Sequence, residues 1–187
     1  MPIPPKPTSA EVYGKIHQFN ATQKYIDLAQ LLDHTFRAKP SNTRLMDVLE
    51  KVMLLNSAYS TNIFDVYEAA GHIVKANIDP LLAIGDLRAV ELIRKMTLGG
   101  KLRDNYVFAT KYCAIHQPSY YRFYDQFVGK TLKYFRRTDK FMKFYNDDLK
   151  NYSKFCKIVA EFEMYYGISG FTPRDLDKYL WLTGKRI

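Results

Sequence analysis

The chain has 187 residues, of which 47% are hydrophobic and 25% are charged, and it carries a formal net charge of +9. This composition predicts a globular chain and excludes a disordered one, while two cysteines are too few for a disulfide scaffold or an iron–sulfur cluster. No apolar run reaches the ~18 residues of a membrane span and the first residues lack a signal peptide, so we expect a cytoplasmic protein without membrane contact.

Prolines and apolar periodicity predict the elements of the first part of the chain. The prolines of residues 1–8 exclude a helix, because each lacks an N–H, and they predict a short flexible arm. The pattern turns helical at Ser9. Ser41 and Asn42 then cap a helix whose buried face has apolar residues at spacings of 3 and 4. That face comprises Leu45, Val48, Leu49, Val52 and Met53.

Capping signals and apolar stripes predict further helices along the rest of the chain. They span residues 62–76, 79–84, 86–98, 104–116, 124–137, 147–166 and 173–183. Asp79-Pro80 opens the second of these helices, and Gly99-Gly100 ends the third. No segment alternates with period two between turn signals. We therefore predict a compact, all-α, multi-helix fold with a single domain over residues 9–187, which we expect to be a monomer.

The positive charge is concentrated in one part of the sequence. Residues 94–157 carry 15 basic and 5 acidic side chains, whereas residues 1–93 carry 9 and 10 and residues 158–187 carry 4 and 4. Most of the aromatic residues lie in the same stretch. Basic residues interleaved with aromatic ones are typical of surfaces that bind nucleic acid, and a solvated basic face over an aromatic core is the alternative.

Lys111 is the first residue to suggest chemistry. The predicted helix 104–116 is apolar almost all round, which indicates an internal helix, and Lys111 projects between Val107 and Ile115. A lysine in this position either extends to solvent or is partly desolvated, and desolvation leaves more of the free amine, the nucleophilic form. The alternative is an ordinary solvated lysine.

Asp125 is the second such residue, and it stands where a new helix begins. As an N-cap, its carboxylate would accept a hydrogen bond from the backbone N–H of Phe127 or Val128. A capping carboxylate is held rigidly in one place. This suits a group that stabilises a transient cation or steers a proton, so capping and catalysis are compatible here.

Two short segments resemble the helix-hairpin-helix DNA glycosylases, specifically the 8-oxoguanine glycosylase-like branch. Ala109-Thr110-Lys111 is similar to the family's nucleophilic lysine early in a helix, and residues 124–128 are similar to its hydrophobic-Asp-x-x-Val segment. Residues 52–63 resemble the end of the family's first core helix and the polar loop that wedges into DNA. The resemblance covers residues 42–137. It departs from the family in having Gly99-Gly100 well ahead of the lysine instead of a nearby Gly-x-Gly turn.

The resemblance implies a base-excision repair enzyme that removes a damaged purine, acting as a hydrolase and, through β-elimination, as a lyase on abasic DNA. Lys111 would attack the sugar C1′, and Asp125 would accept a proton and stabilise cationic character on the sugar. Asn62 would fill the gap in the duplex. The side chains that would meet phosphates are Lys101, Arg103, Lys130, Lys133, Arg136 and Arg137.

Other kinds of site find little support in the sequence. The four histidines show no spacing that builds a metal site, and no P-loop or dinucleotide fingerprint is present, so we expect neither metal nor cofactor. Two alternatives to the enzyme stay open. One is a non-catalytic module on the same scaffold that binds nucleic acid or a protein, and the other is a purely structural helical domain.

Overall fold

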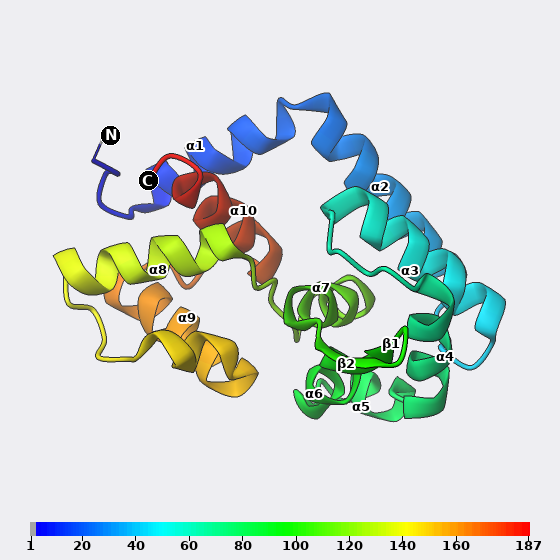
Figure 1. Cartoon of the computed structure of the whole chain (residues 1–187). Coiled ribbons are helices and arrows are strands. Elements are labelled where there is room, and N and C mark those ends of the chain that lie inside the picture. Colours follow the sequence, from blue (N-terminus) through cyan, green and yellow to red (C-terminus); the bar gives the residue numbers. More distant parts are fainter. Residues whose placement is uncertain (1–2) are drawn as a thin grey trace. The chain divides into compact units, whose positions relative to one another are not determined.

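The computed structural model describes residues 3–187, and the chain divides into two compact units (Figure 1). The terminal unit combines the chain up to Ile26 with Arg122–Ile187, and the central unit is Asp27–Tyr121. The chain is mostly helical, which confirms the predicted all-α class. The glycosylase-like detail and the single domain over residues 9–187 remain predictions. Of the predicted arm, Met1 and Pro2 lie outside the described residues, and residues 3–8 contain no helix.

The central unit contains most of α2 and all of the elements from α3 to α7. In chain order these are α2 (Gln23–Ala38), α3 (Leu45–Tyr59), α4 (Val66–Ala76), α5 (Asp79–Ala83), α6 (Arg88–Arg94), β1 (Lys95–Leu98), β2 (Lys101–Asp104) and α7 (Tyr106–His116). Helix α7 is the internal helix that its sequence predicts, because all of its residues from Phe108 to Ala114 are buried. It packs against α6 and α3.

The terminal unit is built from the helices at the two ends of the chain. They are α1 (Ser9–Asn20), the first turn of α2, α8 (Gln126–Thr138), α9 (Tyr152–Tyr166) and α10 (Pro173–Gly184), with a 3-10 turn η1 (Asn146–Lys150) before α9. Helix α10 packs against both α8 and α1. Thr131 of α8 donates a hydrogen bond to the carbonyl oxygen of Leu180 at 2.7 Å, so a buried polar contact joins α8 to α10.

The predicted helix over residues 86–98 is wrong in its last four residues, which form the first strand of an antiparallel β-hairpin. Helix α6 ends at Arg94, and β1 pairs with β2 from Lys95 opposite Asp104 to Leu98 opposite Lys101. Gly99 and Gly100 both have positive φ, 58° and 71°, as a two-residue hairpin turn of the mirror-image type requires. Strand β1 has only four residues, so its alternation of exposed and buried side chains is too short to be recognised in the sequence.

The predicted cap and buried face of α3 need a correction. Its N-cap is Arg44, which makes no side-chain capping hydrogen bond, whereas Asn42 bonds to Asp79. The buried face consists of Val48, Lys51, Val52 and Leu55. Met53 follows Val52 directly, so its side chain points to another side of the helix, and it is 53% exposed.

Candidate functional site

Lys111 lies in the central unit and is almost completely buried, with 4% of its surface exposed. Its position within the first two turns of α7 places Nζ 4.5 Å from the centroid of the Tyr59 ring. An ammonium over an aromatic face is attracted by the ring's electrons. Tyr59 is the last residue of α3, so this contact connects the predicted nucleophile to the point where α3 ends and the polar loop of residues 60–65 begins.

The loop of residues 60–65 is held in one conformation by side-chain hydrogen bonds. Asn56 accepts hydrogen bonds through Oδ1 from the Thr61 hydroxyl and the Ile63 N–H, and its Nδ2 donates to the Ile63 carbonyl, all within 3.0 Å. Ser60 and Asn62 have positive φ, 49° and 60°, a backbone region that asparagine tolerates better than most residues. Asn62 itself is exposed at the surface.

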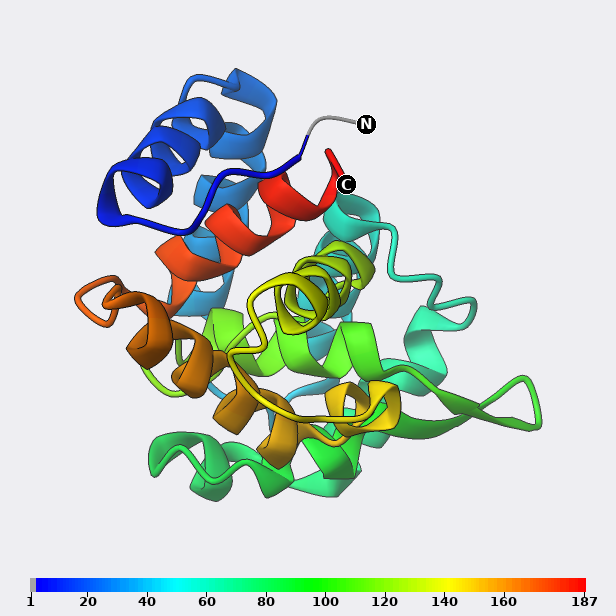
Figure 2. The same cartoon turned by 90° about the vertical axis from the view of Figure 1, so that its left-hand side faces the viewer.

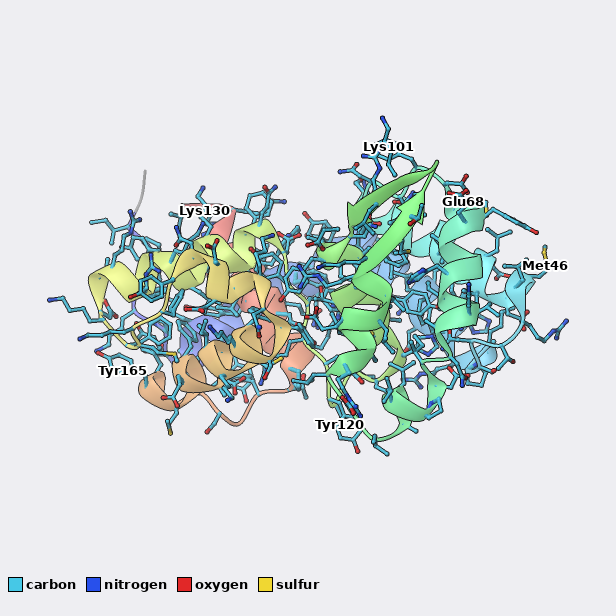
Figure 3. The ribbon with its side chains drawn as sticks, turned by 60° about the horizontal axis from the view of Figure 1, so that its bottom comes forward. Met46, Glu68, Lys101, Tyr120, Lys130 and Tyr165 are labelled. Carbon is cyan, nitrogen blue, oxygen red and sulfur yellow. The ribbon has the colours of Figure 1, made fainter. Side chains whose placement is uncertain are left out.

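The β-hairpin carries two of the predicted phosphate-binding residues, Lys101 and Arg103, both exposed. The hairpin extends away from the helices of its unit in Figure 2, and Lys101 points outward near its end in Figure 3. The Arg103 guanidinium lies 5.3 Å from the centroid of the Phe64 ring, at the end of the polar loop. Glu68 of α4 accepts a hydrogen bond from the Gly99 N–H at 2.6 Å and so restrains the hairpin turn.

Contacts within the central unit therefore connect three residues that the sequence singles out. Lys111 contacts Tyr59, Tyr59 leads into the loop that carries Asn62, and the loop ends at Phe64 against Arg103. Neither the Tyr59 contact nor the Phe64 contact was predicted. The signal in the sequence was Tyr59 directly before the polar residues 60–62 and Phe64 shortly after them.

Asp125 lies in the terminal unit and caps α8 as predicted, since its Oδ1 accepts the Phe127 N–H at 2.8 Å. The backbone that leads to it is fixed by two side chains. The Tyr152 hydroxyl accepts the Arg122 N–H at 2.8 Å and donates to the Arg122 carbonyl at 3.1 Å. Asp177 accepts the Phe123 N–H at 2.8 Å. Lys111 and Asp125 belong to different units, so their pairing in one active site stays a prediction.

Helix α8 carries the other four predicted phosphate contacts, and they are not equivalent. Lys130, Lys133 and Arg137 recur at spacings of 3 and 4 and share one face, and Figure 3 shows Lys130 pointing away from the ribbon. Arg136 instead donates hydrogen bonds to the Phe144 carbonyl at 2.6 Å and to Asn146 Oδ1 at 3.2 Å. The role that the structure gives Arg136 is to hold the segment after α8.

The two units differ strongly in charge. The terminal unit carries 17 basic and 9 acidic side chains, a net charge of +8, and the central unit carries 11 and 10, a net charge of +1. The basic stretch 94–157 is thus divided between units. Most of the positive excess belongs to the unit that contains Asp125 and α8, and little of it to the unit that contains Lys111.

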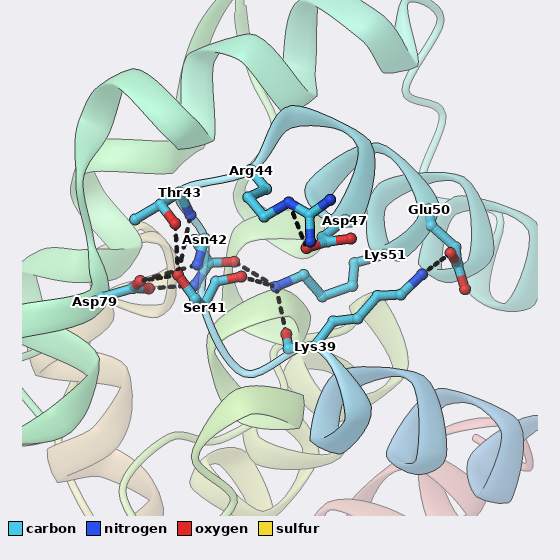
Figure 4. A network of polar contacts seen from close by, with 9 residues as sticks. All are labelled: Lys39, Ser41, Asn42, Thr43, Arg44, Asp47, Glu50, Lys51 and Asp79. Carbon is cyan, nitrogen blue, oxygen red and sulfur yellow. Dashed lines mark hydrogen bonds and ion pairs between the residues drawn. The ribbon is translucent and has the colours of Figure 1, made fainter.

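A buried polar cluster around Lys51 was missed at the sequence level (Figure 4). Lys51 is fully buried, and its Nζ donates to the carbonyl oxygens of Lys39 and Ser41, each at 3.0 Å, and to Asn42 Oδ1 at 2.7 Å. Burial lowers the pKa of Lys51 to about 8. The signal was a lysine in the apolar stripe of α3, between Val48 and Val52.

Asn42 extends this cluster to α5 and α7. Its Nδ2 donates to Asp79 at 2.6 Å, and its Oδ1 accepts the Tyr112 hydroxyl at 2.6 Å. His116 Nε2 lies 3.1 Å from the same oxygen and 3.3 Å from Lys51 Nζ. Burial, reinforced by the Lys51 charge, lowers the pKa of His116 to about 3, so the imidazole is neutral at physiological pH. The cluster joins α7, the helix of Lys111, to α3 and α5.

Asp177 forms a second buried polar cluster, in the terminal unit. Burial raises the pKa of Asp177 to about 7, against the opposing effects of the Phe123 N–H and of Arg174 and Arg122. Nearby, Arg122 forms an ion pair with Glu163 at 2.8 Å, and Glu163 in turn raises the pKa of Asp177. The carboxyl that holds the backbone before Asp125 is thus partly protonated at neutral pH.

Asp177 makes the stability of the terminal unit pH-dependent. The pKa of Asp177 is about 7 in the folded protein, against an ordinary value of 3.8, so protonation of this carboxyl stabilises the folded state. This stabilisation is fully present below pH 4 and is lost as the pH rises through 7. The difference corresponds to roughly 4 kcal/mol. We expect Asp177→Asn to remove this slope in urea unfolding followed by the fluorescence of Trp181, the single tryptophan. Parallel profiles for the variant and the wild type between pH 4.5 and 7.5 would contradict the assignment.

Among residues 3–187, no three His, Cys, Asp or Glu side chains are arranged to hold a metal ion. In the same part of the chain, none of the helices combines the length and the apolar character that crossing a bilayer requires.

Comparison with known proteins gives a family without a described activity. Residues 11–120 match the HI_0787_N family, which is described as an N-terminal domain. The chain is also similar to an uncharacterized protein of Haemophilus influenzae, with 37% identity over 181 residues that cover 96% of this chain and 83% of the relative. No solved structure matches significantly. The family match ends one residue before the end of the central unit, so it includes Lys111 but not Asp125.

Proposed function

This chain belongs to the HI_0787_N family, and we propose that it is a DNA glycosylase whose nucleophile is Lys111. The observation that carries the proposal is the contact between Lys111 and Tyr59 at the start of the polar loop. An enzyme that acts on a base must extrude the nucleotide from the duplex and fill the gap that it leaves. In this proposal the loop with the exposed Asn62 fills the gap, and the buried Lys111 beside the start of the loop meets the extruded nucleotide.

The proposed reaction begins with the neutral Nζ of Lys111. Nζ attacks C1′ of the sugar, the bond from C1′ to the purine nitrogen breaks, and the purine leaves with the electron pair and takes up a proton. The nitrogen then loses a proton, the C1′–O4′ bond breaks with O4′ taking up a proton, and a Schiff base forms between Lys111 Nζ and C1′. Water releases the lysine, or loss of the 2′ proton leads to β-elimination of the 3′ phosphate.

Asp125 is the proposed acceptor of the proton that the nitrogen loses. Its capping hydrogen bond to Phe127 holds one carboxylate oxygen, and the backbone of residues 122–123 ahead of it is anchored by Tyr152 and Asp177. A carboxylate held in this way also stabilises positive charge on the sugar without reorganising during the reaction.

The test is covalent trapping. Borohydride added with duplex DNA that carries oxidised or alkylated purines or an abasic site should reduce the Schiff base and give a stable protein–DNA complex. We expect Lys111→Gln to abolish trapping, and Lys75→Gln, an exposed lysine of the same unit, to retain it. Circular dichroism checks that both variants are folded before trapping is compared. Trapping that survives in Lys111→Gln, or its absence in the wild type with every lesion, would refute the proposed chemistry.

A non-catalytic DNA-binding module is the second candidate, and the net charge of +8 on the terminal unit favours it. Neutralising phosphates with lysine and arginine releases counterions, so the affinity should fall steeply with salt. In the same experiment this function would give strong, salt-dependent binding that Lys111→Gln leaves unchanged, without base release or trapping.

A further inference from the structure

Phe64 is an exposed aromatic residue on a rigid support. Its surface is 77% exposed, although it follows directly on the buried Ile63. The hydrogen bonds of Asn56 fix the loop before it, and Asp65 caps α4 immediately after it by accepting the Glu68 N–H at 2.8 Å. The ring is therefore held out to solvent by ordered backbone on both sides.

The hairpin beside Phe64 is fixed at both ends. At its base, Arg94 donates to both carboxylate oxygens of Asp104, at 3.0 and 2.6 Å, and at its turn Gly99 is bonded to Glu68. Arg103 projects from this framework toward Phe64, with its guanidinium 5.3 Å from the ring centroid. The exposed phenyl ring thus has a positive charge beside it that the hairpin holds in place.

The chemistry of this surface selects its partner. The exposed aromatic ring offers a face for stacking, and Lys95, Lys101 and Arg103 on the hairpin are all exposed cations. A partner that combines a flat π-system with a regularly spaced negative charge is a nucleic acid, whose bases stack on aromatic side chains while the phosphates meet arginine and lysine.

From these observations, and resting on the proposed function, we infer that Phe64 and the hairpin of residues 95–104 form a docking surface for an unpaired base in duplex DNA. Phe64 stacks on the base that has lost its partner, and Arg103 and Lys101 bind the phosphates on either side. The β-hairpin thereby provides the phosphate contacts for which the chain has no Gly-x-Gly turn close to Lys111. The inserted residue is then Phe64, and Asn62 shapes the loop that presents it.

The test compares the affinities of two fluorescein-labelled duplexes by anisotropy, one undamaged and one with a tetrahydrofuran abasic analogue opposite a base. Wild-type protein should prefer the abasic duplex, because its unpaired base is available for stacking. Phe64→Ala should lose about tenfold or more in affinity for the abasic duplex and little for the undamaged one. Arg103→Ala should weaken both and reduce the salt dependence.

Tyr67→Ala is the matched control, because Tyr67 is an exposed aromatic residue, 60% exposed, on the adjoining helix α4. It should retain the preference. Equal preference in Phe64→Ala and wild type, with trapping intact, would overturn the inference and leave the proposed function standing. A preference that depends on Phe64 without any trapping would support the inference and refute the enzyme. A wild-type protein without any preference for the abasic duplex would overturn the inference.

Discussion

Lys51→Met should lower the free energy of unfolding of the central unit by about 2–4 kcal/mol, although Lys51 contacts no proposed substrate. Methionine has nearly the same length but no hydrogen-bond donor. The carbonyl oxygens of Lys39 and Ser41 would lose their contacts to Nζ inside the protein. A buried acceptor left without a partner costs about 1–3 kcal/mol. The variant no longer has to bury an ammonium group, and this gain offsets part of the loss from the unpaired carbonyls.

The control is Lys39→Met, which removes a partly exposed lysine whose ammonium pairs with Glu50 at the surface. Surface ion pairs of this kind contribute about 0–1 kcal/mol. Urea unfolding followed by far-ultraviolet circular dichroism measures both variants. If the two substitutions have the same small effect, the hydrogen bonds of Lys51 are not what holds the segment between α2 and α3.

The pH dependence separates the charge of Lys51 from its packing. Its pKa is lowered to about 8 in the folded protein, from an ordinary value of 10.5, so the unfolded chain binds more protons between these values. The free energy of unfolding of the wild type should therefore rise between pH 8 and pH 10.5, by at most roughly 3 kcal/mol, and decrease again when the pH is lowered to 8. The difference between wild type and Lys51→Met should grow over this range. A constant difference would mean that Lys51 titrates normally.

Most helices of this fold could be predicted because their signals are local, although α4 begins at Val66 rather than at residue 62 and residues 146–150 form the separate 3-10 turn η1. Thr172 and Pro173 mark the start of α10, and the Thr172 hydroxyl does accept the Asp175 N–H at 3.2 Å. The hairpin could not be predicted in the same way, because two four-residue strands leave almost no alternating pattern. Gly99-Gly100 ends a helix or turns a hairpin equally well. The packing of β1 against α4 decides between them, and this contact links residues far apart in the sequence.

The candidate site was predictable to a similar extent. Asp125 as an N-cap follows from the sequence around it. The apolar character of α7 left open whether Lys111 extends to solvent or is desolvated, and the structure buries it. The cluster around Lys51 does not, because its acceptors are backbone carbonyls of residues 39 and 41, which no side-chain pattern reports. The division of the basic stretch between two units likewise depends on tertiary contacts rather than on local sequence.

Gly184→Ala should destabilise the terminal unit by about 3 kcal/mol or more. A Cβ at this position would overlap the carbonyl oxygen of Phe127, and it would lie 2.6 Å from the carbonyl carbon and 2.8 Å from Thr131 Oγ1. The first two atoms are backbone of α8, so no rotamer change relieves the overlap. The helices α8 and α10 must move apart, which also strains the hydrogen bond from Thr131 to Leu180.

Gly14→Ala is the control, because a Cβ at Gly14 in α1 meets no atom within 4 Å. Alanine in the interior of an exposed helix should stabilise it by about 0.5–1 kcal/mol, so the same substitution has opposite signs at two positions of one unit. Trp181 lies three residues before Gly184 and reports unfolding by fluorescence. Since Asp125 is the N-cap of α8, displacement of this helix should also reduce covalent trapping in Gly184→Ala. Wild-type stability in that variant would show that α8 and α10 are not closely packed at Gly184.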